Sequence, residues 1–314
     1  MQACMTLAEH KAHCSDCAQT ADLCLAAPAK INLYLGVFPH DEGHAGYHKV
    51  DTLMAAIELF DWVHISFSKT ARANSIDMTP SFDVAPEENI ALIAANRMCE
   101  VFHRPQNIII SIQKHILPQS GLGGSSSDAA AVIRGLCAQW KISLADARVR
   151  LLARSIGADV AFFLNPLPSF MQGVGNEFVR SYALKQPIYC ALMRPEKGQS
   201  TPCAYRIFDA HPSTPTSPSA LMSFLETGDI DAIARSLYNN LAEALMQDDA
   251  ELVRARDWIA AQPEALSCLL SGSGTAFFAL CKSKEAADSL CARAAKVMKW
   301  WTDSTQVLGM HAEV

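Results

Sequence analysis

The sequence predicts an α+β fold built from two domains. Strand-like and helix-like segments follow one another without strict alternation, which favours α+β over a regular α/β arrangement. The chain has 314 residues, of which 50% are hydrophobic and 18% are charged. This length lies above the size at which one hydrophobic core usually stops growing, so two domains are expected. No repeat of solenoid period is evident.

The composition argues against several classes of function. The net charge is −6, so the chain lacks the basic balance that binding to nucleic acid or to an anionic membrane requires. No apolar run approaches the roughly 18 residues of a transmembrane helix, and no signal peptide is predicted. The 11 cysteines are scattered and odd in number, which is typical of reduced thiols. We therefore expect a cytoplasmic protein that binds neither nucleic acid nor a membrane.

Residues 1–24 carry a histidine and cysteine cluster, made of His10, His13, Cys14 and Cys17. A His-Cys-x-x-Cys cluster can bind zinc, but the second Cys-x-x-Cys of a typical zinc site is absent. The pattern favours a poorly ordered extension over a metal site.

Residues 25–38 read as a strand, because apolar residues alternate with other residue types from Ile31 to Val37. This period places Lys30 and Asn32 on one face. A lone lysine at a strand start is usually solvated, whereas a second polar residue two places on indicates a shared site.

The loop 39–50 ends in Gly46-Tyr47-His48. An aromatic residue beside a histidine can stack on a nucleobase and hydrogen-bond to it. The alternative is a turn anchored by a tyrosine. After the loop, residues 51–67 are predicted to form two strands with a turn at Asp61-Trp62, and residues 88–103 a helix.

A glycine-rich loop is the central feature of the chain. It runs from Pro118 through Gly121, Leu122, Gly123 and Gly124 to Ser125, Ser126 and Ser127, between the predicted strand 107–112 and an apolar helical pattern. Glycine allows close backbone approach, and the first N–H groups of a helix attract anions, so this order of elements is typical of a phosphate site. The serines can cap the helix or donate hydroxyls. An ordinary capped helix is the alternative.

Further along the chain, Asp159 interrupts an apolar run just after the predicted helix Ser143–Ser155. It is either a helix cap or a catalytic carboxylate. The other predicted elements are a strand-turn pattern at 168–182, a strand at 187–194, helices at 219–227, 229–246 and 247–261, a strand at 276–281 and a helix at 284–298.

Three separated motifs resemble those of the GHMP kinases over about residues 25–282. They begin at Pro28 (Pro-Ala-Lys-Ile-Asn-Leu), at Gly121 (Gly-Leu-Gly-Gly-Ser-Ser-Ser-Asp-Ala-Ala) and at Ser271 (Ser-Gly-Ser-Gly). Within this family, Gly-Tyr-His followed by Asp51-Thr-Leu-Met, and Gly157-Ala-Asp-Val, are similar to kinases of a cytidine-diphosphate-linked methylerythritol. The chain departs from the usual pattern in having Ser125 for a third consecutive glycine and Ala45 for an aspartate.

The resemblance implies a two-domain architecture. After the extension 1–24, residues 25–167 would form an N-terminal ribosomal-protein-S5-like domain that holds the ATP loop and the catalytic residues. Residues 168–314 would form a C-terminal α/β sandwich domain.

The resemblance also implies a reaction, in which the γ-phosphoryl group of ATP passes to the 2-hydroxyl of the cytidine substrate in non-mevalonate isoprenoid precursor synthesis. Asp159 would be the general base and Lys30 its charged partner, while Asn32 would place the hydroxyl. Tyr47 and His48 would recognise cytosine, and Thr201 matches a substrate-side position.

ATP phosphates would lie in the glycine loop, over Pro118, Gly121, Leu122, Gly123, Gly124, Ser125, Ser126 and Ser127. Mg²⁺ is expected with ATP, and the protein would be a monomer or a weak homodimer. Two alternatives stay open. Another GHMP enzyme, such as a mevalonate- or homoserine-type kinase, would not need the Gly-Tyr-His element, and a non-catalytic ATP sensor would not need both Lys30 and Asp159.

Overall fold

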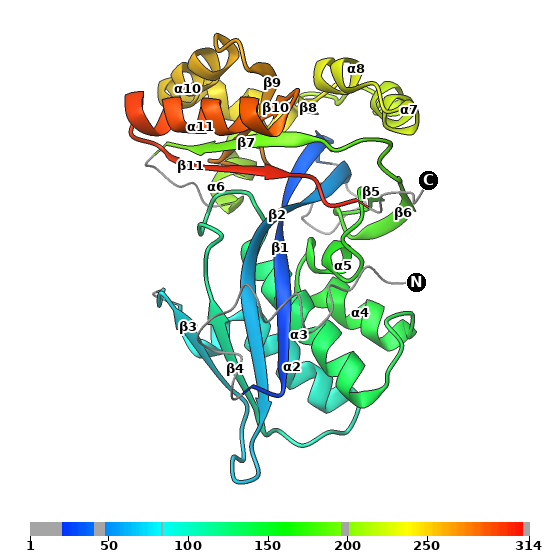
Figure 1. Cartoon of the computed structure of the whole chain (residues 1–314). Coiled ribbons are helices and arrows are strands. Elements are labelled where there is room, and N and C mark those ends of the chain that lie inside the picture. Colours follow the sequence, from blue (N-terminus) through cyan, green and yellow to red (C-terminus); the bar gives the residue numbers. More distant parts are fainter. Residues whose placement is uncertain (1–20, 41–47, 83, 196–200, 310–314) are drawn as a thin grey trace. The chain divides into compact units, whose positions relative to one another are not determined.

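The computed structural model describes residues 21–40, 48–82, 84–195 and 201–309 (Figure 1). Helices and strands are mixed along the chain, which confirms the α+β class. The chain divides into two compact units, the first made of residues 1–29, 59–117 and 123–165, and the second of residues 30–58, 118–122 and 166–314. Strands β1 (Leu23–Val37) and β2 (Val50–Phe67) contribute residues to both units. The predicted domains 25–167 and 168–314 rest on the family resemblance and stay a prediction.

The first unit contains strands β3 (Ser75–Thr79) and β4 (Ile108–Gln113). β3 pairs with β4 in parallel, and β4 pairs antiparallel with residues 62–67 of β2. Along β4, Ile108, Ile110 and Ile112 are buried while Ile109 is exposed, so one face of this strand packs against the core.

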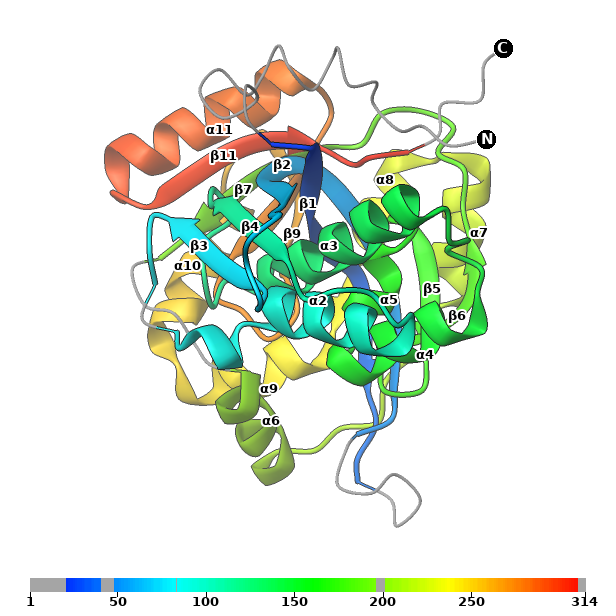
Figure 2. The same cartoon turned by 90° about the horizontal axis from the view of Figure 1, so that it is seen from below.

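Helices cover that core. They are η1 (Pro86–Glu88), α2 (Ile90–Val101), α3 (Gly124–Trp140), α4 (Ala147–Ile156) and α5 (Val160–Phe163). Figures 1 and 2 both place α2, α3 and α4 on one side of the strands of this unit. The Asn89 side chain caps α2 by accepting from the N–H of Ala91, and Asp146 caps α4 through the N–H of Arg148.

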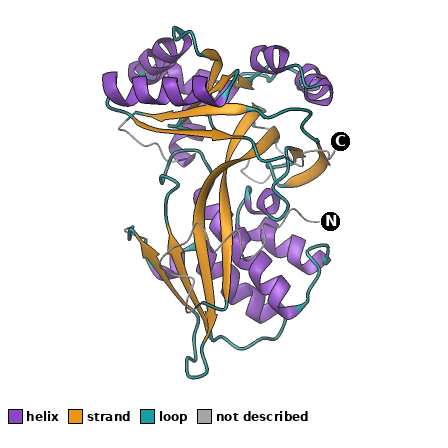
Figure 3. Cartoon of the chain, viewed as in Figure 1, coloured by secondary structure: helices purple, strands orange, loops and turns teal. Residues whose placement is uncertain are grey.

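The second unit has a four-stranded antiparallel sheet in the order β11-β7-β10-β9. The strands are β7 (Tyr189–Arg194), β9 (Ala265–Leu270), β10 (Phe277–Cys281) and β11 (Trp301–Gln306). Helices α10 (Ala250–Ala260) and α11 (Lys284–Val297) lie on one face of it (Figure 3). Phe277, Ala279 and Cys281 of β10 belong to the buried cluster of this unit.

The remaining elements of this unit complete its framework. They are β5 (Ser169–Gln172), β6 (Glu177–Ser181), α6 (Thr201–Ala210), α7 (Ser219–Thr227), α8 (Ile230–Arg235), β8 (Tyr238–Asn239) and α9 (Asn240–Asp248). β8 pairs in parallel with β1 at Tyr34 and Leu35, and β5 pairs antiparallel with residues 52–54 of β2. The whole seven-stranded sheet has the order β3-β4-β2-β1-β8, with β5 and β6 added at β2.

Three predicted boundaries are wrong. Residues 51–67 form the single strand β2 instead of two, because Asp61 is fully buried within it and accepts a hydrogen bond from the N–H of His115, which is distant in sequence. The predicted helix 229–246 is interrupted by β8, and the helix expected from Ser143 begins at Ala147, after Asp146. Helix α6 and strands β3, β8, β9 and β11 were not predicted. In the part of the chain that the structure describes, no helix is both long and apolar enough to cross a bilayer.

Candidate active site

Lys30 and Asn32 share one face of β1, as the strand period predicts. Nζ of Lys30 donates to Oδ1 of Asn32 at 2.6 Å, and Nδ2 of Asn32 donates to Oγ1 of Thr52 at 2.9 Å. The Thr52 hydroxyl donates in turn to the carbonyl of Tyr34 at 2.8 Å. Lys30, Asn32 and Thr52 are all buried. A buried ammonium requires such partners, and this chain of hydrogen bonds holds it in one place.

The three motifs meet in the second unit, although they are far apart in sequence. The N–H of Lys30 donates to the carbonyl of Leu122 at 2.9 Å. The hydroxyl of Ser271 donates to the carbonyl of Gly121 at 3.1 Å. A Cβ on Gly272 would lie 3.0 Å from Nζ of Lys30. The first residues of the glycine loop therefore lie between the strand that carries Lys30 and the Ser271-Gly-Ser-Gly turn.

Asn239 holds that turn and was missed in the sequence. Its Nδ2 donates to the carbonyls of Leu270 and Gly272, each at 2.9 Å, while its Oδ1 caps α9 through the N–H of Ala242. The Asn239-Asn240 pair before an apolar helix is an N-cap signal, but the predicted helix 229–246 ran through it.

Thr201 lies at the start of α6 and is exposed. Its Oγ1 is 2.9 Å from Oγ of Ser273. This contact connects the predicted substrate-side residue to the third motif. Pro118, at the start of the glycine loop, is exposed.

The second part of the glycine loop begins α3 in the first unit. Gly123 has a φ of 75°, in the left-handed region that favours glycine, and the helix starts at Gly124 without a side-chain cap. Ser125, Ser126 and Ser127 are therefore first-turn residues and not N-caps. Ser127 is fully buried, and its Oγ has no hydrogen-bond partner among the described residues.

A buried cluster of two aspartates and one lysine holds the chain just before this loop. Lys114 donates to Asp61 and, at 2.6 Å, to Oδ2 of Asp128. Oδ1 of Asp61 also accepts from the N–H groups of His115 and Ile116, at 2.6 and 2.8 Å. Since Asp128 belongs to α3, the cluster connects β2, the end of β4 and the first turns of α3.

The two carboxylates compete for one ammonium. Burial raises the pKa of Asp128 to about 8, with the negative charge of Asp61 acting in the same direction and Lys114 acting against it. Burial by itself would lower the pKa of Lys114, but Asp128 and Asp61 outweigh it and raise that pKa. The sequence offered no signal for this cluster, because its members are distant and each is usually a surface residue.

Asp159 precedes α5, and its side chain makes no capping hydrogen bond to that helix. It is half-buried, in contrast to the burial that the surrounding apolar run predicts. Asp159 belongs to the first unit and Lys30 to the second. The pairing of Lys30 with Asp159 therefore stays a prediction.

His48 is buried before β2, whereas Tyr47 lies outside the described residues, as do His10, His13, Cys14 and Cys17. Nδ1 of His48 is 2.9 Å from the carbonyl of Phe38. Its ring stacks on Tyr205 of α6, with centroids 5.2 Å apart, and meets Phe208 edge-on. Tyr205 lies outside the motifs that the sequence shows.

Comparisons with known proteins assign the chain to a family. The N-terminal domain of the GHMP kinases matches residues 89–165, and their C-terminal domain matches residues 221–299. The 4-diphosphocytidyl-2-C-methyl-D-erythritol kinase of Caldicellulosiruptor bescii is 32% identical over 262 residues, covering 83% of this chain and 90% of that protein.

Solved structures extend the comparison. A crystal structure of 4-(cytidine 5'-diphospho)-2C-methyl-D-erythritol kinase is similar at a TM-score of 0.73 and 30% identity, covering 91% of this chain and 100% of that one. The homoserine kinase of Cytophaga hutchinsonii has a TM-score of 0.72 at 20% identity, covering 91% of this chain and 94% of its own. That second similarity concerns the fold alone. Because kinases of different substrates share this fold, the fold by itself does not identify the substrate.

The fold and the three converging motifs define a GHMP kinase, and the chain belongs to that family. The two proteins above that are 30% or more identical to it place it, within the family, among the 4-diphosphocytidyl-2-C-methyl-D-erythritol kinases.

Proposed function

We propose that this protein transfers the γ-phosphoryl group of ATP to the 2-hydroxyl of 4-diphosphocytidyl-2-C-methyl-D-erythritol, in the synthesis of isoprenoid precursors. The observation that carries the proposal is the meeting of Lys30, the Gly121-Leu122 backbone and Gly272 in the second unit. A buried ammonium beside glycine-rich backbone is suited to the charge of a transferring phosphoryl group.

Lys30 would stabilise negative charge on the transferred group and keep Asp159 ionised. Its ammonium is already positioned by Asn32, which Thr52 orients, so little reorganisation is needed when charge develops. Asn32 would place the acceptor hydroxyl. Asp159 would accept the proton of that hydroxyl, which lets its oxygen attack the γ-phosphorus as the bond to the β-phosphate oxygen breaks.

The glycine loop would hold the phosphates of ATP. Gly123 precedes α3 in the left-handed conformation and provides no side chain to cap the helix. The first N–H groups of a helix attract anions. Ser127 offers a buried hydroxyl without a partner among the described residues, and oxygen donors of this kind suit Mg²⁺. We assign Ser127 to the Mg²⁺ that accompanies ATP, whose chemistry is to neutralise charge on the phosphates.

Cytosine recognition is assigned to the segment that ends at His48. Nδ1 of His48 is engaged by the Phe38 carbonyl, and its ring contacts Tyr205. We therefore infer that His48 orients the aromatic face of Tyr205, while Tyr47 supplies the stacking contact predicted from the sequence. Thr201, next to Ser273, would contact the substrate from α6. The expected partner is thus a small molecule with a cytidine diphosphate group. We expect a monomer or weak homodimer in the cytoplasm.

A phosphorylation assay with a panel of alcohols tests the proposal. The purified protein with ATP and Mg²⁺ should phosphorylate the cytidine compound and leave mevalonate and homoserine unchanged. Removing the cytidylyl group from the substrate should raise KM by at least one to two decades, since stacking on a base is worth roughly 1–3 kcal/mol. Efficient phosphorylation of mevalonate or homoserine would reject the substrate while keeping the family, and no turnover of any alcohol would favour the ATP sensor.

A further inference from the structure

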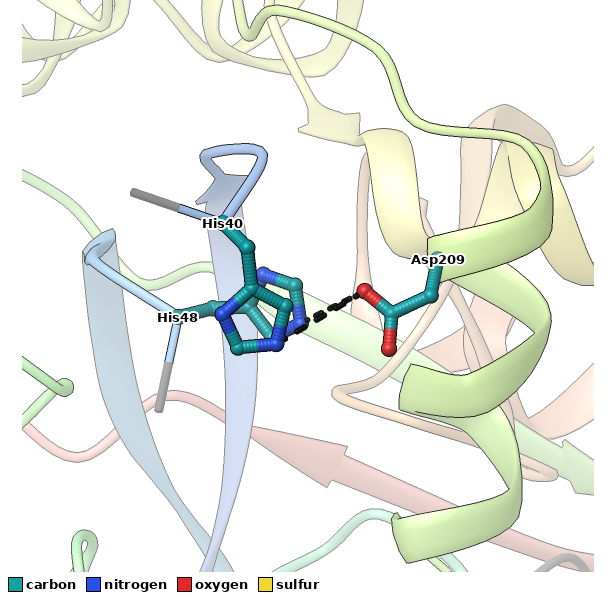
Figure 4. A group of neighbouring side chains, drawn as sticks. All are labelled: His40, His48 and Asp209. Carbon is teal, nitrogen blue, oxygen red and sulfur yellow. Dashed lines mark ion pairs between the residues drawn. The ribbon is translucent and has the colours of Figure 1, made fainter. Parts of the chain in front are cut away.

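Two histidines and one aspartate of the second unit point toward one another (Figure 4). His40 follows β1, His48 precedes β2 and Asp209 lies near the end of α6. Nε2 of His48 is 3.1 Å from Oδ1 of Asp209, and Nε2 of His40 is 3.8 Å from the same oxygen. One ligand atom from each residue lies within 4.8 Å of the other two. These separations suit three ligands of one ion, whose bonds to nitrogen and oxygen are about 2.0–2.2 Å long.

The tautomer of His48 determines which of its ring nitrogens can bind a cation. The carbonyl of Phe38 can only accept a hydrogen bond, so the nitrogen that faces it at 2.9 Å, Nδ1, carries the proton. In the neutral ring, Nε2 then presents a lone pair to the carboxylate of Asp209. That nitrogen is buried and has no hydrogen-bond partner among the described residues. Two lone pairs facing each other at 3.1 Å repel, so a cation between them is favoured.

A single proton satisfies only part of this arrangement. A proton on Nε2 of His48 would pair that ring with Oδ1 of Asp209. It would not bind the second imidazole, His40, to the same oxygen. The two rings lie with centroids 3.9 Å apart, which is unfavourable if both are charged. A metal ion binds both neutral imidazoles and the carboxylate together. The Nδ1–H to carbonyl bond of His48 is also the second-sphere contact that orients metal-binding histidines.

We propose that His40, His48 and Asp209 bind a divalent transition-metal ion, with Zn²⁺ as the preferred ion. Two imidazole nitrogens and one carboxylate oxygen favour Zn²⁺ over Mg²⁺ or Ca²⁺, which prefer oxygen ligands. The side chains of His40 and Asp209 are 44% and 43% exposed, so the ion can enter from solvent and keep a water as its fourth ligand. The ion would join the ends of β1 and β2 to α6. This site is separate from the Mg²⁺ that accompanies ATP, and it does not depend on the proposed function.

Metal titration of the full chain, without ATP or substrate, tests the site. Calorimetry with ZnCl₂ should detect binding that His40→Ala and Asp209→Asn each weaken by at least ten-fold. His211→Ala is the matched control. His211 follows α6 and is paired with Asp248 at 3.7 Å. It does not belong to the group of His40, His48 and Asp209, so this variant should bind Zn²⁺ like the wild type. His40 is exposed, which makes His40→Ala a safe test even if Asp209→Asn perturbs α6.

Cobalt separates this site from the cysteines near the N-terminus. Co²⁺ bound by His40, His48 and Asp209 should give visible ligand-field bands without a thiolate charge-transfer band, and His40→Ala should remove them. Zn²⁺ should also raise the Tm of the wild type more than that of His40→Ala. Equal affinity in wild type and His40→Ala, a thiolate band that persists in that variant, or no binding at all would each overturn the proposal.

Discussion

Gly121 and Ser271 are in backbone contact: a Cβ built on Gly121 would lie 2.0 Å from the carbonyl oxygen of Ser271. Gly121 also has a φ of 78°, in the left-handed region. The glycine loop and the Ser271-Gly-Ser-Gly turn can approach this closely only because residue 121 has no side chain. The position therefore requires glycine for two independent reasons, conformation and space.

Gly121→Ala should destabilise the protein and abolish binding of an ATP analogue. Alanine in the left-handed region costs about 1 kcal/mol, and displacing the Ser271 backbone adds roughly 1–3 kcal/mol. Gly175→Ala is the control, since Gly175 has a φ of 88° but a Cβ there would meet only Val50 at 3.9 Å and Thr52 at 4.0 Å. Thermal unfolding and calorimetry compare the two variants. Equal loss of stability in both variants would mean that the close contact with Ser271 contributes nothing to the cost of Gly121→Ala.

Local signals explain what could be predicted from the sequence. The alternation around Lys30 placed it on one face with Asn32, and the glycine pattern placed a loop of close backbone approach before α3, because strand period and glycine conformation are local properties of the chain. The single strand through Asp61 could not be predicted in this way. A polar residue in a strand pattern resembles a turn until its partner Lys114, 53 positions away, is known.

The same limit applies to Asn239 and α6. Asn239 breaks a helical pattern because it has distant carbonyl partners at Leu270 and Gly272. Helix α6 follows a Pro- and Gly-containing stretch, and only two of its residues, Ala204 and Phe208, are buried, so its apolar signal was weak. Partners supplied by tertiary contacts are what single-sequence patterns do not contain.

Lys30→Met should lower kcat by roughly 10²–10³-fold while affinity for ATP changes little, because the charge is needed most when the phosphoryl group transfers. Steady-state kinetics and calorimetry with an ATP analogue separate the two effects. Thr52→Val is the control for altered packing. Thr52→Val removes the hydroxyl that orients Asn32 but keeps the ammonium of Lys30. It should therefore cost only about 1 kcal/mol of stability, and it should lower kcat less than Lys30→Met does. A rise in ATP KM with unchanged kcat in Lys30→Met would make Lys30 a binding residue.

Asp128→Asn should change how stability depends on pH. The pKa of Asp128 in the folded protein is raised to about 8, above its value of 3.8 in the unfolded chain. The folded state therefore binds the proton more tightly, so this contribution to stability is complete below about pH 4 and is lost as the pH rises toward 8. Urea unfolding across this range should show a fall in the free energy of unfolding of the wild type that Asp128→Asn lacks.

Asp77→Asn is the matched control for this titration, because Asp77 is an exposed carboxylate on β3 of the same unit. It should keep the pH profile of the wild type. A parallel profile in Asp128→Asn and the wild type would show that the second carboxylate beside Lys114 stays ionised across the range.

Asp159→Asn should lower turnover by roughly 10²–10⁴-fold, the usual contribution of a general base, and leave binding of an ATP analogue nearly unchanged. The reason is chemical, since asparagine keeps the shape of the side chain but cannot accept the proton of the substrate hydroxyl. Asp146→Asn provides the comparison within the same unit. Asp146 caps α4 through the N–H of Arg148, and asparagine is an equally good cap, so that variant should retain both stability and kcat. Turnover close to the wild type in Asp159→Asn would remove Asp159 from the mechanism, and an equal fall in kcat in Asp146→Asn would assign the effect to general loss of an acidic side chain.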